Sequence, residues 1–181
     1  MGGDGGRNRV TPRLRSGPAL ELPANSPLRD LQDSAVLVVL LRSFGCTFCR
    51  EAMADVAAAR PQLEAAGVRI AFVHGAPADE AEPWFAKYRL HDVVRVSDPG
   101  LEHYRTFSLG RTGVQVLADP AVWARGAVCA LSHGFGTQSA GLMRQLPGVF
   151  VVQGNAILEE YRHRSPSDRP DYLALTRRAL Q

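Results

Sequence analysis

The hydrophobic positions of this chain fall into short continuous runs and into one long stretch with a helical period. Residues 35–41 form the longest apolar run, and residues 68–73 form a second segment that is alternating and β-branched. Runs of this length and composition predict buried strands. Between them the pattern predicts a helix that begins near Cys46, kinks or breaks at Pro61 and ends at Gly67. The apolar positions on one face of this helix are Cys49, Ala52, Met53, Val56, Ala59 and Leu63.

The rest of the chain predicts a similar alternation of helices and strands. Acidic residues early in 77–89 and basic ones late favour a helix there, because they complement the helix dipole. A Gly-Asn pair at 154–155 between two apolar runs is typical of a β-hairpin. The remaining predicted elements are a strand at 93–96, a helix at 101–107, a mixed region at 109–146 with a helix near 119–131, hairpin strands at 148–153 and 156–162, and a final helix from about 168.

This order of elements predicts an α/β protein. A β-α-β-α-β-α half is followed by an insertion and then by a β-β-α half, which is the thioredoxin-like order with one extra βα unit. We therefore expect a central mixed sheet flanked by helices, with the insertion before the final hairpin. Residues 18–181 are predicted to form this domain, and residues 1–17 a disordered basic tail.

Charge and composition exclude several classes of function. Residues 1–17 carry four arginines and one aspartate, so residues 18–181 hold 17 basic and 17 acidic side chains. A balanced domain does not offer the basic surface that a nucleic-acid partner requires. The longest apolar run is far shorter than the roughly 20 residues that span a bilayer. We expect no nucleic-acid partner, no membrane association and no secretory signal.

The candidate chemistry lies at the junction between the first predicted strand and the first predicted helix. Cys46 and Cys49 form a Cys-x-x-Cys pair on the first turn of that helix. Free N–H groups and the positive end of the helix dipole stabilise a thiolate there, so we expect a lowered pKa for Cys46. Cys49 lies one turn deeper. Cys46, with solvent beside it, is the predicted nucleophile, and Cys49 the thiol that resolves the adduct.

Two other interpretations of the cysteines remain open. Free cysteines often serve as small buried hydrophobic residues. Alternatively, Cys129 and His133, four residues apart on a predicted helix, complete a zinc quartet with Cys46 and Cys49. A closed metal site would occupy the thiols needed for redox chemistry, so we expect no metal, and we expect Cys129 to be a buried core residue.

The motif around the cysteines carries a family resemblance. The segment 44–51, FGCTFCRE, resembles the signature of peroxiredoxin-like proteins of the alkyl hydroperoxide reductase / thiol-specific antioxidant superfamily. The nearest branch resembles the selenoprotein-L-related redox proteins, in which selenocysteine can replace either cysteine. Segment 145–152 before the fourth core strand, and 161–164 with Asp168, resemble further motifs of that branch. The resemblance covers about residues 20–180 and implies a thioredoxin-like fold and thiol chemistry.

The same resemblance suggests residues that support the pair. Ser43 stands where peroxiredoxins carry a serine or threonine, although Val39 replaces their proline. Thr47 lies inside the motif, and Arg144, before the fourth core strand, is a candidate thiolate partner or else a solvated loop residue. Pro147 matches the position at which thioredoxin folds keep a cis-proline facing the cysteines, so a cis and a trans peptide are both open.

We therefore expect a cytoplasmic thiol oxidoreductase with a redox-active disulfide between Cys46 and Cys49 and no other cofactor. Its substrate would be a peroxide or a disulfide, and a cellular dithiol would regenerate it. The alternatives are a protein disulfide reductase without peroxidase activity and a non-enzymatic redox-sensing or zinc-stabilised interaction domain. A homodimer stays open, as do the identities of the substrate and the reductant.

Overall fold

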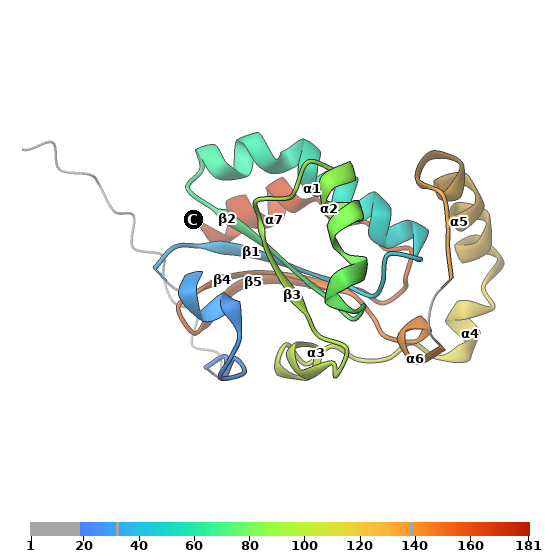
Figure 1. The fold of residues 1–181 in the computed structure, drawn as a ribbon, viewed down its shortest axis with the longest axis horizontal. Coiled ribbons are helices and arrows are strands. Elements are labelled where there is room, and N and C mark those ends of the chain that lie inside the picture. Colours follow the sequence, from blue (N-terminus) through green and yellow to red (C-terminus); the bar gives the residue numbers. More distant parts are fainter. Residues whose placement is uncertain (1–18, 32, 138–139) are drawn as a thin grey trace, which may run out of the picture.

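The computed structural model describes residues 19–31, 33–137 and 140–181. The predicted tail at 1–17 lies outside this part of the chain. A five-stranded sheet with the strand order β3-β2-β1-β4-β5 forms the centre of the protein (Figure 1). The strands are β1 (Val36–Leu41), β2 (Arg69–His74), β3 (Val94–Ser97), β4 (Gly148–Gln153) and β5 (Ala156–Arg162). The predicted mixed sheet is confirmed.

Strand β1 is the centre of the sheet, as its wholly apolar sequence requires. It pairs in parallel with β2 and antiparallel with β4, and all six of its residues are buried. Successive side chains of a strand point to opposite faces. Leu37, Val39 and Leu41 therefore belong to one hydrophobic core, and the other three residues of β1 belong to a second core across the sheet. A strand buried on both faces reads as a continuous apolar run.

Helices cover both faces of this sheet (Figure 1). Helix α1 (Thr47–Ala65), helix α7 (Tyr172–Ala179) and helix α2 (Glu82–Lys87) cover the face to which Leu37 points. Helix α3 (Glu102–Thr106) and the 3-10 helix η1 (Pro27–Leu31) cover the other. Since β1 leads directly into α1, the Cys-x-x-Cys pair lies at the carboxyl edge of the sheet.

The predicted insertion forms a helical cap at this edge. It contains α4 (Val114–Leu117), α5 (Pro120–His133) and α6 (Ala140–Met143). Helix α5 begins where the chain offers both a cap and a proline: the Asp119 side chain accepts a hydrogen bond from the Ala121 N–H, and Pro120 occupies the first turn. Helix α5 packs on the first turn of α1, where Gly126 approaches the Phe48 ring.

The largest differences from the predicted boundaries fall in three places. The helix predicted at 77–89 is two shorter elements, η2 (Ala78–Glu80) and α2. Helix α1 continues through Pro61 to Ala65 instead of breaking there. Helix α7 begins at Tyr172, four residues later than predicted. Pro170 disfavours helical geometry at Arg169, and Asp171 caps the helix by accepting from the Ala174 N–H.

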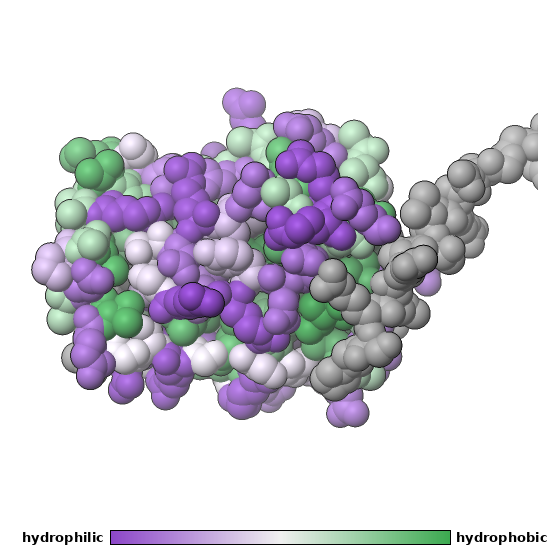
Figure 2. All heavy atoms as spheres, turned by 180° about the vertical axis from the view of Figure 1, so that it is seen from behind, coloured by the Kyte–Doolittle hydropathy of each residue, from purple (hydrophilic) through white to green (hydrophobic). Residues whose placement is uncertain are grey.

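The outer surface of α5 and of the loop that follows it is unusually apolar. Trp123, Val128 and Leu131 on the helix and Phe135 in the loop are all exposed, and Leu131 reaches 89%. Figure 2 shows apolar surface at the left edge of the molecule, where this end of the protein lies when viewed from behind. None of the helices in the described ranges has the length and hydrophobicity that a membrane span requires.

Candidate active site

The two cysteines of the motif lie together at the start of α1. Cys46 is the N-cap residue of the helix, and Cys49 closes the first turn by donating its backbone N–H to the Cys46 carbonyl at 3.1 Å. Both are free thiols. Cys46 is 2% exposed and Cys49 is 3% exposed. The expectation of solvent beside Cys46 was therefore wrong, because α5 and the loop after it cover this turn.

Arg42, the first residue after β1, donates hydrogen bonds to both sulfur atoms. Its Nη2 donates to Cys46 Sγ at 2.8 Å, and its backbone N–H donates to Cys49 Sγ at 3.3 Å. Its Nη1 donates to the carbonyl of Met143 at the end of α6 at 2.7 Å. Arg42 is only 4% exposed. Because a buried guanidinium requires a counter-charge, this contact favours the thiolate form of Cys46.

The environment shifts the pKa values of the two cysteines in opposite directions. A hydrogen bond from the Cys49 thiol and the positive charge of Arg42 lower the pKa of Cys46 to about 5, although burial acts in the opposite direction. The hydrogen bond to Cys46 and burial raise the pKa of Cys49 well above its usual range. One thiolate and one thiol at neutral pH are the states that a nucleophile and a resolving group require.

Replacing Arg42 with methionine is expected to raise the pKa of Cys46 by about 1 to 3 pH units, the usual effect of losing an adjacent opposite charge. About half or more of Cys46 would then be protonated at pH 6, where the wild-type thiolate predominates. Titration of the ultraviolet thiolate absorbance measures this change. Arg42→Lys retains the charge and is the matched control. An unchanged titration in Arg42→Met would contradict the role of the guanidinium.

Ser43 and Thr47 flank Cys46, but their hydroxyl groups do not bind its sulfur. Ser43 Oγ and Thr47 Oγ1 are both buried and have no hydrogen-bond partner among the described residues. Arg42 Nε is a third such atom. The Ser43 carbonyl accepts the Cys46 N–H at 3.3 Å. The residues next to Cys46 in the chain therefore provide three buried polar atoms whose hydrogen-bonding capacity is unused.

The other two supporting candidates lie in different places. Arg144 is exposed, and its Nε donates to the Thr112 carbonyl at 3.2 Å. The thiolate partner is Arg42 instead, a residue that the sequence analysis did not identify. The one feature of the sequence that pointed to Arg42 is its position, as an arginine at the end of an otherwise wholly apolar strand. Pro147 does line a pocket together with Cys49. Its peptide is trans, since the described residues include no cis peptide bond.

Arg50 and Glu51, the last residues of the motif, attach α1 to its surroundings. The Arg50 Nε donates to the Phe44 carbonyl at 2.6 Å, and its Nη1 donates to the His133 carbonyl at 3.1 Å. Glu51 accepts from Arg125 on α5 at 2.6 Å. The Gly136 N–H donates to the Gly45 carbonyl at 2.9 Å, so the loop after α5 crosses directly over the cysteine turn.

The four side chains of the alternative zinc quartet do not lie together. Among the described residues, the one group of three or more metal-ligand side chains with ligand atoms within 4.8 Å of one another is Glu51, Cys129 and His133. Cys46 and Cys49 are not part of it. Arg125 and Arg169 both form ion pairs with Glu51, and their positive charge opposes a dication there. Cys129 is buried, as predicted, with its thiol 3.6 Å from the Thr47 carbonyl.

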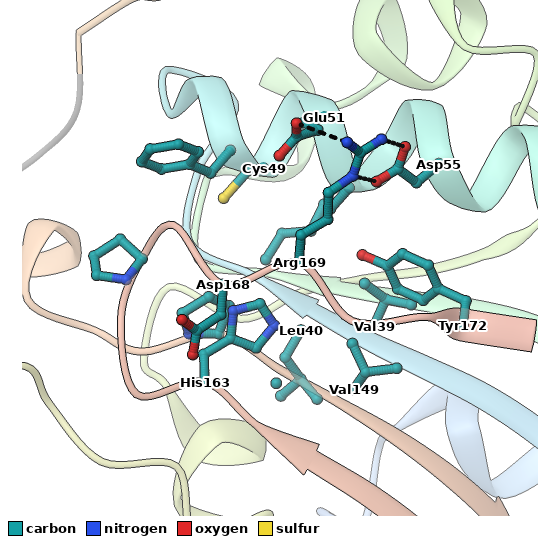
Figure 3. A pocket seen from close by; sticks show the side chains of 16 residues that line it. Val39, Leu40, Cys49, Glu51, Asp55, Val149, His163, Asp168, Arg169 and Tyr172 are labelled. Atoms are coloured by element: carbon teal, nitrogen blue, oxygen red, sulfur yellow. Dashed lines mark hydrogen bonds and ion pairs between the residues drawn. The ribbon is translucent and has the colours of Figure 1, made fainter. Parts of the chain in front are cut away.

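A pocket opens beside Cys49, between α1 and the segment that follows β5 (Figure 3). Cys49 projects into it from α1, and His163 lies on the opposite wall, directly after β5. Arg169 forms part of its rim and binds Asp55 through two hydrogen bonds of 2.7 and 2.8 Å. The site therefore has two sides: a polar, covered side at Cys46 and a pocket at Cys49.

Comparison with known proteins establishes the fold of the chain. No protein-family profile and no curated protein sequence matches it. Prx3 of Vibrio vulnificus, solved in complex with hydrogen peroxide, is 14% identical over 86% of both chains, with a TM-score of 0.60. The bacterioferritin comigratory protein of Xanthomonas campestris is 14% identical over 85% of both chains, with a TM-score of 0.58.

Peroxidoxin BcpB of Mycobacterium tuberculosis is 13% identical and has a TM-score of 0.55, covering 84% of this chain and 80% of its own. The protein thus has the thioredoxin-like fold of the peroxiredoxins, which confirms the predicted fold class. At identities this low the similarity describes the fold, and the activity must be argued from the site.

Proposed function

We propose that the protein is a thiol-dependent oxidoreductase of the peroxiredoxin type. The observation that carries this proposal is the 2.8 Å contact between the buried Arg42 guanidinium and Cys46 Sγ, with the Cys49 thiol beside it. The Cys46 thiolate attacks one peroxide oxygen, the O–O bond breaks, and an alcohol or water leaves after protonation. Cys49 then attacks the Cys46 sulfenic acid, releasing water and forming the disulfide.

Burial favours a small oxidant over a protein disulfide. Cys46 is 2% exposed, so a folded protein substrate cannot place its disulfide against the sulfur without moving the loop over Gly45. The unused Arg42 Nε, Ser43 Oγ and Thr47 Oγ1 offer donors to the oxygens of a bound peroxide. Prx3 of Vibrio vulnificus binds hydrogen peroxide on the same fold, and the Xanthomonas protein is described by its alkyl peroxide reduction activity.

A protein disulfide reductase without peroxidase activity is the second candidate. A low-pKa cysteine followed by a resolving thiol one turn away is also what disulfide exchange requires. In that reaction Cys46 would form a mixed disulfide and release one substrate thiol, and Cys49 would release the other. The covering loop would then have to open during each turnover. A redox-sensing domain without turnover is the third alternative.

The proposal includes the remaining components of the cycle. A cellular dithiol reduces the Cys46–Cys49 disulfide, and no cofactor beyond these two thiols takes part. Three free cysteines are suited to the reducing environment of the cytoplasm, where we place the protein.

One comparison of rates tests these alternatives. Reduced protein is mixed with one equivalent of hydrogen peroxide in a stopped-flow instrument, and its ability to reduce an insulin-type disulfide is measured separately. We expect rapid oxidation by peroxide and slow insulin reduction. Insulin turnover without rapid peroxide oxidation would support the disulfide reductase instead, and the absence of both reactions would leave the sensing domain.

A further inference from the structure

Cys49 cannot attack the oxidised Cys46 while it keeps its proton, and the structure places a proton acceptor across the pocket from it. His163 is 8% exposed, and its Nδ1 is buried without a hydrogen-bond partner among the described residues. Its backbone N–H donates to the Pro147 carbonyl at 3.3 Å, which attaches it to the start of β4. Cys49, Pro147 and His163 all line the same pocket (Figure 3).

The carboxylates of this pocket are already engaged. Asp55 and Glu51 bind Arg169, and the Asp168 carboxylate accepts the backbone N–H groups of Arg164 and Ser165. The titratable and charged groups that face His163 are Arg42 after β1, Cys49, Glu51 and Asp55 on α1, Tyr161 on β5, Asp168 and Arg169 before α7, and Tyr172 on α7.

We propose that His163 accepts the proton of the Cys49 thiol when Cys49 resolves the oxidised Cys46. This inference rests on the proposed function. The Cys49 sulfur forms the S–S bond, the S–O bond of the Cys46 sulfenic acid breaks, and the departing hydroxide takes a proton from solvent to become water, while the His163 imidazolium later returns the thiol proton to solvent. The cavity volume of the pocket is about 20 Å³. About 10–15 Å³ measured in this way is enough to hold one water, so a single water molecule can relay the proton from Cys49 Sγ to His163 Nδ1.

The electrostatics of the pocket suit this role. Burial lowers the pKa of His163 to about 4, so the imidazole is neutral at physiological pH and can accept a proton. Asp168 and the Ser165 backbone favour the charged imidazolium once the proton has arrived. Oxidation of Cys46 also removes the negative charge that faces Arg42. The Arg42 backbone N–H already donates to Cys49 Sγ, so the cation then stabilises a thiolate at Cys49 instead.

The pH dependence of the wild-type protein provides the first test. Disulfide formation after one equivalent of peroxide can be followed by stopped-flow fluorescence, because Trp84 lies near the site, 4.0 Å from the Arg50 guanidinium. With His163 as the acceptor, the rate of this phase should stay nearly constant from about pH 5 to about pH 8. A rate that rises about tenfold per pH unit would show that bulk solvent deprotonates Cys49 and would overturn the proposal.

His163→Asn provides the second test, and His91→Asn, at an exposed histidine, is the matched control. General-base catalysis typically contributes about 10²- to 10⁴-fold, so we expect His163→Asn to slow disulfide formation at least about 100-fold. The first phase, oxidation of Cys46, should keep its wild-type rate, and the slow phase should become pH-dependent. Wild-type resolution in His163→Asn, or equal slowing of both phases, would overturn the inference.

These experiments separate the two proposals. If wild-type protein shows no oxidation phase with peroxide or with a small disulfide, the proposed function itself fails. If wild-type protein oxidises and His163→Asn then resolves as fast, only the role of His163 fails. If His163→Asn does not fold, the wild-type pH profile decides alone.

Discussion

Replacing Cys46 with serine is expected to abolish turnover completely. Cys46 is the thiolate bound to Arg42, and its lowered pKa supplies the nucleophile at neutral pH. Cys49 cannot complete the cycle in its place, because burial still raises the pKa of Cys49 and no second thiol remains on this turn of α1 to form the internal disulfide. A serine hydroxyl is neither ionised at neutral pH nor readily oxidised. Peroxide consumption in the presence of a dithiol measures the loss.

The control for this experiment is the third cysteine. Cys129 is buried near the same turn, with a pKa raised by burial and its thiol 3.6 Å from the Thr47 carbonyl. Cys129→Ser removes a thiol of similar burial and should retain most of the activity. Residual turnover in Cys46→Ser that disappears when Cys129 is also replaced would show that Cys129 is the nucleophile. Full activity in Cys46→Ser alone would refute the assignment.

The strand and helix order was predictable because the core of this fold is encoded locally. A run that is apolar at every position, such as 35–41, fits a central strand buried on both faces. Gly154-Asn155 fixes the hairpin within a few residues, and its two strands have the predicted bounds. The position of the cysteines at the carboxyl edge follows from the same pattern, since β1 leads directly into α1.

The residues that contact the cysteines were less predictable, because they are brought together by contacts between segments far apart in the sequence. Arg42 is held by the Met143 carbonyl, 101 residues later in the chain. The sequence pattern predicted the helix that became α5 but not what it covers, and so Cys46 was expected beside solvent. The family resemblance suggested Arg144 as the thiolate partner, because it lies just before β4. The arginine that contacts the thiolate is instead Arg42, which is buried directly after β1.

Replacing Cys49 with serine is expected to leave a protein that reacts once and then stops. Cys46 would still attack peroxide, because Arg42 remains and a serine hydroxyl can donate the hydrogen bond that the Cys49 thiol donates. Without a resolving thiol the product stays at the sulfenic acid. A sulfenic-acid trapping reagent and intact mass should show one added oxygen per chain, whereas wild-type protein should form an internal disulfide and show no trapped adduct.

A second substitution at the same position separates the two roles of Cys49. Cys49→Ala also removes the resolving thiol, but it removes the hydrogen bond that contributes most to the lowered pKa of Cys46. Both variants should therefore stall at the sulfenic acid, whereas only Cys49→Ala should react more slowly at pH 6, because less of its Cys46 is ionised. The order of attack can be read from alkylation. If protein that keeps only Cys49 is alkylated faster at pH 6 than protein that keeps only Cys46, Cys49 is the attacking thiol and the assigned roles are reversed.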